Sequence, residues 1–223
     1  MQLIHSLNFC AGESAGGNLA AAVALKLRDD EFQPAVKMQV LINPVVQALD
    51  FMLPSMLQNE NSPLLPRKGI SIVVSLYLEG NIDKMQTFMT NDHVSPDIKK
   101  MKVPYIDVTQ LPSKYLVGYE KPNVETGNET MWNELKEKLL NPYFAPLVAE
   151  RLDNLPLAYI FTSEYDPLRD EGFLYAHRLR NSGVTVEHVH SDIGLHGVLQ
   201  FHSVCPEAET MFKELTKFFA DNL

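Results

Sequence analysis

A serine set between glycines is the feature of this sequence that most directly suggests chemistry. Residues 12–16 read Gly-Glu-Ser-Ala-Gly and match the pattern G-x-S-x-G, with Ser14 at the centre. In this pattern the serine is a nucleophile on a sharp turn between a strand and a helix. We expect small residues on both sides because larger side chains would collide with that strand and helix. A phosphate-binding loop would need Lys-Ser/Thr after Gly17, where Asn18-Leu19 stand, whereas an ordinary glycine turn remains an alternative.

A nucleophilic serine needs a base and an acidic residue that orients the base. In proteins with this serine turn the acid and then the histidine follow the serine along the chain, and Asp166 and His196 stand in that order. An Asp directly before Pro is also a good helix N-cap, and Asp170 and Glu164 are rival acids. The backbone N–H of Ala15, at the start of a predicted helix, is the candidate donor to a developing oxyanion.

Two further features of the sequence could suggest a site. His188 and His190 alternate onto one face of a predicted strand and suggest a metal ion shared with His196 or His202. No carboxylate or thiol pattern completes such a site, so we expect no metal. Cys10, one strand step before the serine turn, is predicted to be a buried small hydrophobic residue rather than a nucleophile.

Alternating strands and helices are expected to position these groups. Strands are predicted at 7–11, 35–43, 157–162 and 184–190, and helices at 18–28, 167–181 and 206–220. The last helix carries one apolar stripe, made of Met211, Phe212, Leu215, Phe218 and Phe219. This order predicts an α/β fold with a mostly parallel sheet flanked by helices, and ligands bind such sheets at the carboxyl ends of the strands.

Residues 49–152 interrupt this alternation and are predicted to form an inserted helical cap. The core then consists of residues 1–48 and 153–223. The insert is rich in Pro and Asn, and five of its methionines are Met52, Met56, Met85, Met89 and Met101. Flexible thioethers suit a surface that moulds around apolar ligands, but they equally suit gaps in a small helical core.

Length, composition and charge exclude several classes of protein. The 223 residues are 45% apolar and 21% charged, which is typical of a globular protein of one domain. The net charge of −9 and the absence of a Lys/Arg cluster argue against nucleic acid as a partner. The longest strongly apolar run, 70–78, is about half of the ~20 residues that a membrane-spanning helix needs.

The runs Gly12–Ala22 and Tyr165–Gly172, with the late His196-Gly197, resemble the hormone-sensitive-lipase-like α/β-hydrolases and, within them, the arylacetamide deacetylase branch. The resemblance extends over the whole chain. It implies that Ser14 is the nucleophile, Asp166 the orienting acid and His196 the general base, without a metal or organic cofactor. It also implies hydrolysis of carboxylic esters and some amides of small lipophilic substrates.

The resemblance further implies a location at the endoplasmic reticulum membrane. Many animal members of the family are held there by an N-terminal anchor, with the catalytic domain in the lumen. The glycosylation sequon Asn128-Glu129-Thr130 fits a lumenal location. Membrane association follows from the resemblance alone, and the oligomeric state is left open.

The chain departs from the family at its beginning. Relatives carry a His-Gly-Gly-Gly motif that supplies further oxyanion donors, and no such run occurs here, where thirteen residues precede Ser14. We therefore expect the first four of eight strands to be missing, the fifth to eighth to remain, and the strand at 7–11 to be an open edge. Loss of one oxyanion donor costs roughly 10²–10³ in rate, so turnover is expected to be low.

The sequence therefore leaves three alternative functions open. The first is a serine carboxylesterase. The second is a catalytically impaired truncated isoform or fragment that acts, if at all, by association. The third is a serine peptidase of the prolyl-oligopeptidase kind, against which the run Gly12–Gly17 and the insert argue.

Overall fold

Four parallel strands form the sheet, and they pair side by side in the order in which they follow one another along the chain. The computed structural model describes residues 9–100, 105–120 and 127–222. The strands are β1 (Phe9–Glu13), β2 (Met38–Ile42), β3 (Leu157–Tyr165) and β4 (Val186–Leu195). All four predicted strands are confirmed, although positions 7 and 8 lie outside the described residues. In the described part of the chain, β1 pairs only with β2.

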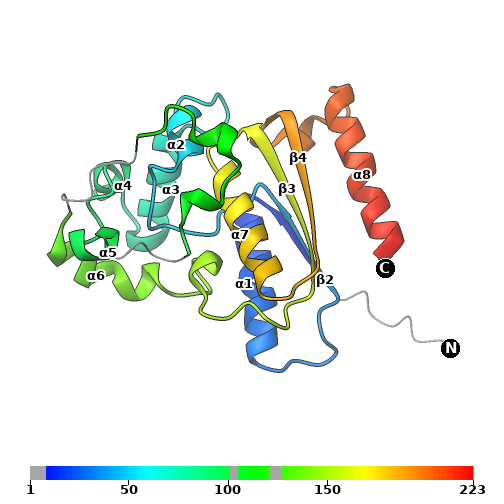
Figure 1. The fold of residues 1–223 in the computed structure, drawn as a ribbon, viewed down its shortest axis with the longest axis horizontal. Coiled ribbons are helices and arrows are strands. Elements are labelled where there is room, and N and C mark those ends of the chain that lie inside the picture. The colour runs from blue at the N-terminus through cyan, green and yellow to red at the C-terminus, as the bar shows by residue number, and fades with distance from the viewer. Residues whose placement is uncertain (1–8, 101–104, 121–126, 223) are drawn as a thin grey trace.

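Helices cover both faces of this sheet (Figure 1), as expected for parallel strands that are buried on both sides. Helices α1 (Ala15–Asp29) and α7 (Arg169–Asn181) pack on one face, whereas α8 (Pro206–Asn222) packs on the other. Of the predicted stripe on α8, Leu215 and Phe218 are buried. Phe212, at one side of the stripe, is 42% exposed and stacks on His202.

Short helices fill the chain between β2 and β3 and gather to one side of the sheet (Figure 1). They are α2 (Pro54–Gln58), α3 (Arg67–Glu79), α4 (Met85–Met89), α5 (Pro96–Lys100) and α6 (Glu129–Leu139), with 3₁₀ turns at Val108–Gln110, Ser113–Leu116 and Pro146–Val148. One cluster of buried apolar side chains runs from α1 and α7 into this region. No helix in the described ranges combines the length and the apolar character needed to cross a membrane.

The methionines of this region differ in burial. Met56 is fully buried in the apolar cluster, so it fills the core. Met52, Met85 and Met89 are half-buried. Met101 lies outside the described residues.

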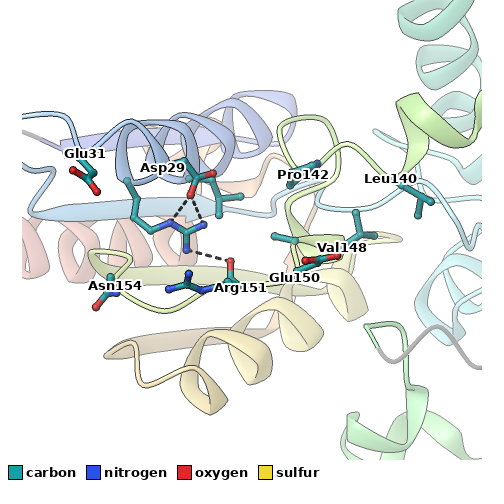
Figure 2. Close-up of a pocket in the computed structure, with 11 residues that line it drawn as sticks. Asp29, Glu31, Leu140, Pro142, Val148, Glu150, Arg151 and Asn154 are labelled. Atoms are coloured by element: carbon teal, nitrogen blue, oxygen red, sulfur yellow. Dashed lines mark hydrogen bonds and ion pairs between the residues drawn. The ribbon is translucent and has the colours of Figure 1, made fainter.

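A cavity of about 690 Å³ lies at the edge of the sheet where the strands begin (Figure 2). It is lined in part by residues just after α1, such as Glu31, and just before β3, such as Asn154. Arg28 in its wall is paired with Asp29 and donates to the carbonyl of Arg151 at 3.1 Å. Ligands of parallel sheets bind at the opposite edge, where the strands end.

Candidate active site

Ser14 stands between the end of β1 and the start of α1 in a backbone conformation that is rare for a residue with a side chain. Its φ is 58° and its ψ is −119°. Neighbouring backbone holds this turn: the Ser14 N–H donates to the Ile42 carbonyl at 2.9 Å, and the Ser14 carbonyl accepts from the Asn18 N–H at 3.0 Å. Strain of this kind persists only where the surroundings fix it, and it is common at active sites.

The glycines around Ser14 are required to different degrees. A Cβ at Gly12 would overlap the carbonyl of Gly16, and a Cβ at Gly17 would lie 3.0 Å from the Pro44 side chain. A Cβ at Gly16 would meet nothing within 4 Å. A single methyl group is therefore excluded at Gly12, crowded at Gly17 and free of contacts at Gly16, whereas the expectation concerned larger side chains.

The structure brings Ser14, His196 and Asp166 into one hydrogen-bonded chain. His196 Nε2 lies 3.0 Å from Ser14 Oγ, and His196 Nδ1 lies 2.8 Å from Asp166 Oδ2. Asp166 is completely buried and His196 is 9% exposed. A proton on Nδ1 donates to the carboxylate and leaves Nε2 free to accept the serine proton, which is the arrangement that activates a serine.

The elements that carry Asp166 and His196 differ in detail from the prediction. Strand β4 continues to Leu195, so His196 directly follows the strand instead of a loop after His190. Helix α7 begins at Arg169 and not at Pro167. Asp166 Oδ1 accepts from the Leu168 N–H at 2.8 Å, so one carboxylate both holds the turn before α7 and binds the imidazole.

The rival acids are bound elsewhere. Asp170 pairs with Arg169 Nε at 3.0 Å and accepts from the Ser55 N–H at 2.6 Å. Glu164 accepts from Tyr115 Oη at 2.8 Å and lies 3.0 Å from His190. Burial disfavours the ionised form of Glu164, but the hydrogen bonds from Tyr115 and His190 and the charge of Arg169 bring its pKa below the usual range.

Ala15 is the first residue of α1. The first N–H groups of a helix have no partner within the helix and lie at its positive end. The backbone N–H of Ala15 therefore stays the predicted oxyanion donor.

Two polar residues near the serine turn were missed in the sequence. Asn18 donates from Nδ2 to the carbonyls of Val45 at 2.7 Å and Phe144 at 2.8 Å. Glu171 accepts from the Val46 N–H at 2.7 Å, and its burial raises its pKa to about 8. Both fix the loop after β2, whose Val45 N–H approaches the Ser14 carbonyl at 3.4 Å. Their partners lie more than twenty residues away in the sequence, so spacing gives no signal for either role.

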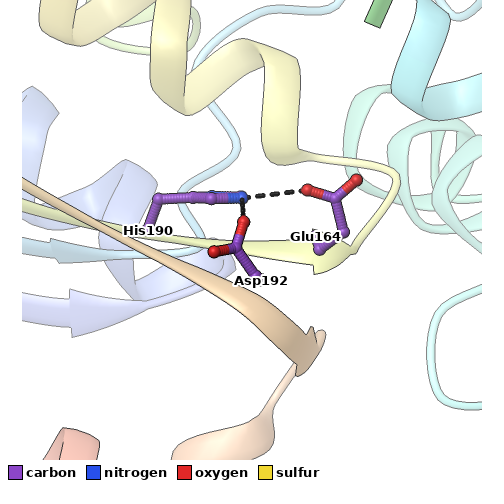
Figure 3. Close-up of side chains that lie close together, drawn as sticks. All are labelled: Glu164, His190 and Asp192. Atoms are coloured by element: carbon purple, nitrogen blue, oxygen red, sulfur yellow. Dashed lines mark hydrogen bonds and ion pairs between the residues drawn. The ribbon is translucent and has the colours of Figure 1, made fainter. Parts of the chain in front are cut away.

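A second group of side chains consists of Glu164 on β3 and of His190 and Asp192 on β4 (Figure 3). Their potential ligand atoms lie within 4.8 Å of one another, and in the described ranges they are the only such group of three or more. The Lys114 ammonium lies 3.4 Å from Glu164 and 3.5 Å from Asp192, so a cation already compensates these carboxylates.

The histidines that suggested a metal site are separated. His188 and His190 share Thr162 Oγ1, at 2.9 Å from each ring. His196 is bound to Ser14 and Asp166 instead, and His202 stacks on Phe212. His188 and His190 therefore do not group with His196 or His202.

Cys10 lies in β1, half-buried against the main apolar cluster. Burial raises the pKa of its thiol. Because the thiolate is the reactive form, this environment does not activate Cys10.

Comparison with known proteins places this site in a family. The sequence matches the family described as alpha/beta hydrolase fold over residues 6–137 and 103–200. Neutral cholesterol ester hydrolase 1 of Bos taurus is 39% identical over 199 residues, which cover 86% of this chain and 48% of the relative. Arylacetamide deacetylase of Oryctolagus cuniculus is 36% identical over 198 residues, which cover 86% of this chain and 49% of the relative. The chain thus spans about half the length of the curated relatives it matches.

A solved structure supports the same conclusion. The crystal structure of ESTFA in its Fe-lacking apo form superposes with a TM-score of 0.63 at 25% identity, over 99% of this chain and 53% of that one. Sequence matches and shared fold agree with the resemblance carried by the runs Gly12–Ala22 and Tyr165–Gly172. This chain belongs to the hormone-sensitive-lipase-like α/β-hydrolase family, in the branch of arylacetamide deacetylase and neutral cholesterol ester hydrolase.

Proposed function

We propose that this chain carries the catalytic groups of a serine carboxylic-ester hydrolase. The observation that carries the proposal is the hydrogen-bonded chain from Ser14 Oγ through His196 to Asp166, with contacts of 3.0 and 2.8 Å. Membership of a hydrolase family whose curated relatives are named for ester and amide cleavage supports it.

The mechanism follows from the protonation of His196. Nε2 takes the proton of Ser14 as Oγ attacks the ester carbonyl, and the resulting tetrahedral intermediate expels the alcohol, which receives that proton from His196. Water then attacks the acyl-enzyme while His196 again acts as base, and the carboxylic acid leaves Ser14. Asp166 keeps Nδ1 protonated and stabilises the imidazolium in both steps.

The oxyanion of the tetrahedral intermediate is held by the backbone N–H of Ala15 at the start of α1. The His-Gly-Gly-Gly donors of relatives do not occur in this sequence. Each lost donor costs roughly 10²–10³ in rate, so we expect slow turnover by the chain on its own.

The substrates are small lipophilic esters or amides. This expectation rests on the relatives, which are named for cholesterol esters and arylacetamides. Residues 49–152 act as the cap over the site, and their half-buried methionines offer adaptable apolar surface to such substrates.

The protein works at the endoplasmic reticulum membrane with this domain in the lumen. Support comes from the exposed sequon at Asn128, whose Oδ1 accepts from the Met131 N–H at 2.9 Å and caps α6. A glycan on Nδ2 leaves that cap in place. Removal of N-glycans with PNGase F should shift the natural protein on a gel, and Thr130→Ala should abolish the shift; an unshifted natural protein contradicts lumenal glycosylation.

Hydrolysis of p-nitrophenyl butyrate tests the proposed activity. Purified chain should release p-nitrophenolate slowly, and Ser14→Ala should release none above background. Equal rates for the two proteins would make the assignment wrong. Comparison of esters with dipeptides tests the prolyl-oligopeptidase alternative. A folded chain that neither hydrolyses esters nor reacts at Ser14 would favour the impaired isoform that acts by association.

A further inference from the structure

The carboxylate of Asp166 stands in a very short connection. Only three residues, Asp166, Pro167 and Leu168, separate the end of β3 at Tyr165 from the start of α7 at Arg169. A movement of this connection changes the distance between Asp166 Oδ2 and His196 Nδ1, which is 2.8 Å here.

Ser55 of helix α2 is bound to this connection and to the start of α7 by buried hydrogen bonds. The Ser55 N–H donates to Asp170 Oδ2 at 2.6 Å, and the Asp170 N–H donates to Ser55 Oγ at 3.3 Å. Ser55 Oγ in turn donates to the carbonyl of Pro167 at 2.6 Å. Ser55 and Asp170 are both completely buried, so water cannot replace these bonds.

Side chains near the end of α2 make further hydrogen bonds to the same region. Asn59 Nδ2 lies 3.3 Å from the Glu164 carbonyl and 3.4 Å from the Asp166 carbonyl. Gln58 Oε1 accepts from Arg169 at 2.8 Å, and Arg169 pairs with Asp170 at 3.0 Å. Residues on both sides of Asp166 are therefore hydrogen-bonded by α2 and by Asn59, which directly follows it, more than a hundred residues earlier in the chain.

We propose that Ser55 is a positioning residue for the reaction, because it fixes the Pro167 carbonyl and Asp170 and thereby places the carboxylate of Asp166 against His196. Ser55 touches neither Ser14 nor His196 among its described bonds and acts only through the acid connection. The proposal rests on the proposed function. It also makes α2 part of the catalytic geometry, so the region between β2 and β3 does more than cover the site.

A double-mutant cycle on the rate of fluorophosphonate labelling at Ser14 tests this role. Ser55→Ala should slow labelling roughly 10–100-fold, since displacement of a catalytic group by about 1 Å costs rates of this order. In a chain that already carries Asp166→Asn, Ser55→Ala should cost less than about twofold, because the acid that it positions no longer works. An equal loss in both backgrounds means a general structural effect and overturns the proposal.

Ser71→Ala is the matched control. Ser71 is also completely buried, but among the described residues its hydroxyl donates only to the Arg67 carbonyl of its own helix α3, at 3.2 Å. This variant should label as fast as the natural chain. Ser55→Thr, which keeps the hydroxyl, should recover part of the rate.

The remaining outcomes are also decisive. If Ser55→Ala melts below the assay temperature, Asn59→Ala replaces it in the same cycle with the same expectation. A further outcome is that Asp166→Asn slows labelling while Ser55→Ala and Asn59→Ala both leave its rate unchanged. That result overturns the positioning role alone. A natural chain that is not labelled at Ser14 overturns the proposed function and the positioning role with it.

Discussion

His196 Nε2 lies 3.0 Å from Ser14 Oγ, although 182 residues separate the two in the chain. Parallel pairing of all four strands directs every carboxyl end to one edge of the sheet. Ser14 follows β1, Asp166 follows β3 and His196 follows β4, so all three groups arrive at that edge. This contact between two residues at opposite ends of the chain depends on the whole sheet.

Replacement of the acid should disable the base while the site keeps its shape. In Asp166→Asn, the amide donates to His196 Nδ1, which places the imidazole proton on Nε2, where it can no longer accept from Ser14. We expect kcat to fall by roughly 10⁴, as for the same change in other serine hydrolases with this arrangement. Asp192→Asn is the control because Asp192 is 79% exposed and outside the site. If Asp166→Asn hydrolyses the ester at a rate within about threefold of that of the natural chain, Asp166 is not the orienting acid.

Two glycines of the same turn should respond oppositely to alanine. Gly12→Ala forces a methyl group into the Gly16 carbonyl, and we expect a loss of stability of at least about 1–3 kcal/mol. Gly16→Ala places its methyl in open space within the first turn of α1, and it should be neutral or stabilise by up to about 1 kcal/mol. Urea unfolding of the two variants measures both effects. Equal destabilisation would contradict the packing of β1 against α1.

Buried His93 should make the fold sensitive to acid. Burial lowers its pKa to about 4, whereas an unfolded chain takes up this proton near 6.5. The neutral ring therefore stabilises the folded state above pH 6.5, and that contribution is lost as pH falls toward 4. The loss amounts to about 2–3 kcal/mol between pH 7 and 4.5, at ~1.36 kcal/mol per unit.

His93→Gln isolates this contribution. Glutamine does not titrate and can still donate to the Ala48 carbonyl, which accepts from His93 Nε2 at 3.0 Å. The free energy of unfolding should fall less between pH 7 and 4.5 in the variant than in the natural chain. Titration of the carboxylates lowers it equally in both proteins, so the difference between them reports His93. The same decrease in both would show that His93 takes up its proton in the folded chain.

The order of strands and helices was predictable because the apolar runs of β2 and β3 are long and the helices have clear ends. The ends of β3 and β4 were not. Polar residues follow Thr162 and His190, yet the two strands continue to pair as far as Tyr165 and Leu195, across a register shift. Pairing between distant segments, and not local hydrophobicity, decides where these strands stop.

Some residues of the candidate site were predictable from the sequence and others were not. Ser14, Asp166 and His196 could be named in advance because the serine turn imposes a local pattern and the others follow strands. Ser55 and Glu171 could not, since buried polar residues are recognisable only from partners such as Asp170 and Val46, more than a hundred residues away.

The most direct test of the account is the site of covalent labelling by a fluorophosphonate. The natural chain should gain the mass of one phosphonyl group, and peptide mapping should place it on Ser14. Ser14→Ala should gain none, and labelling should slow strongly in Asp166→Asn. Labelling at another residue, or labelling of the folded chain that persists in Ser14→Ala, would contradict the claim that Ser14, His196 and Asp166 form the catalytic site.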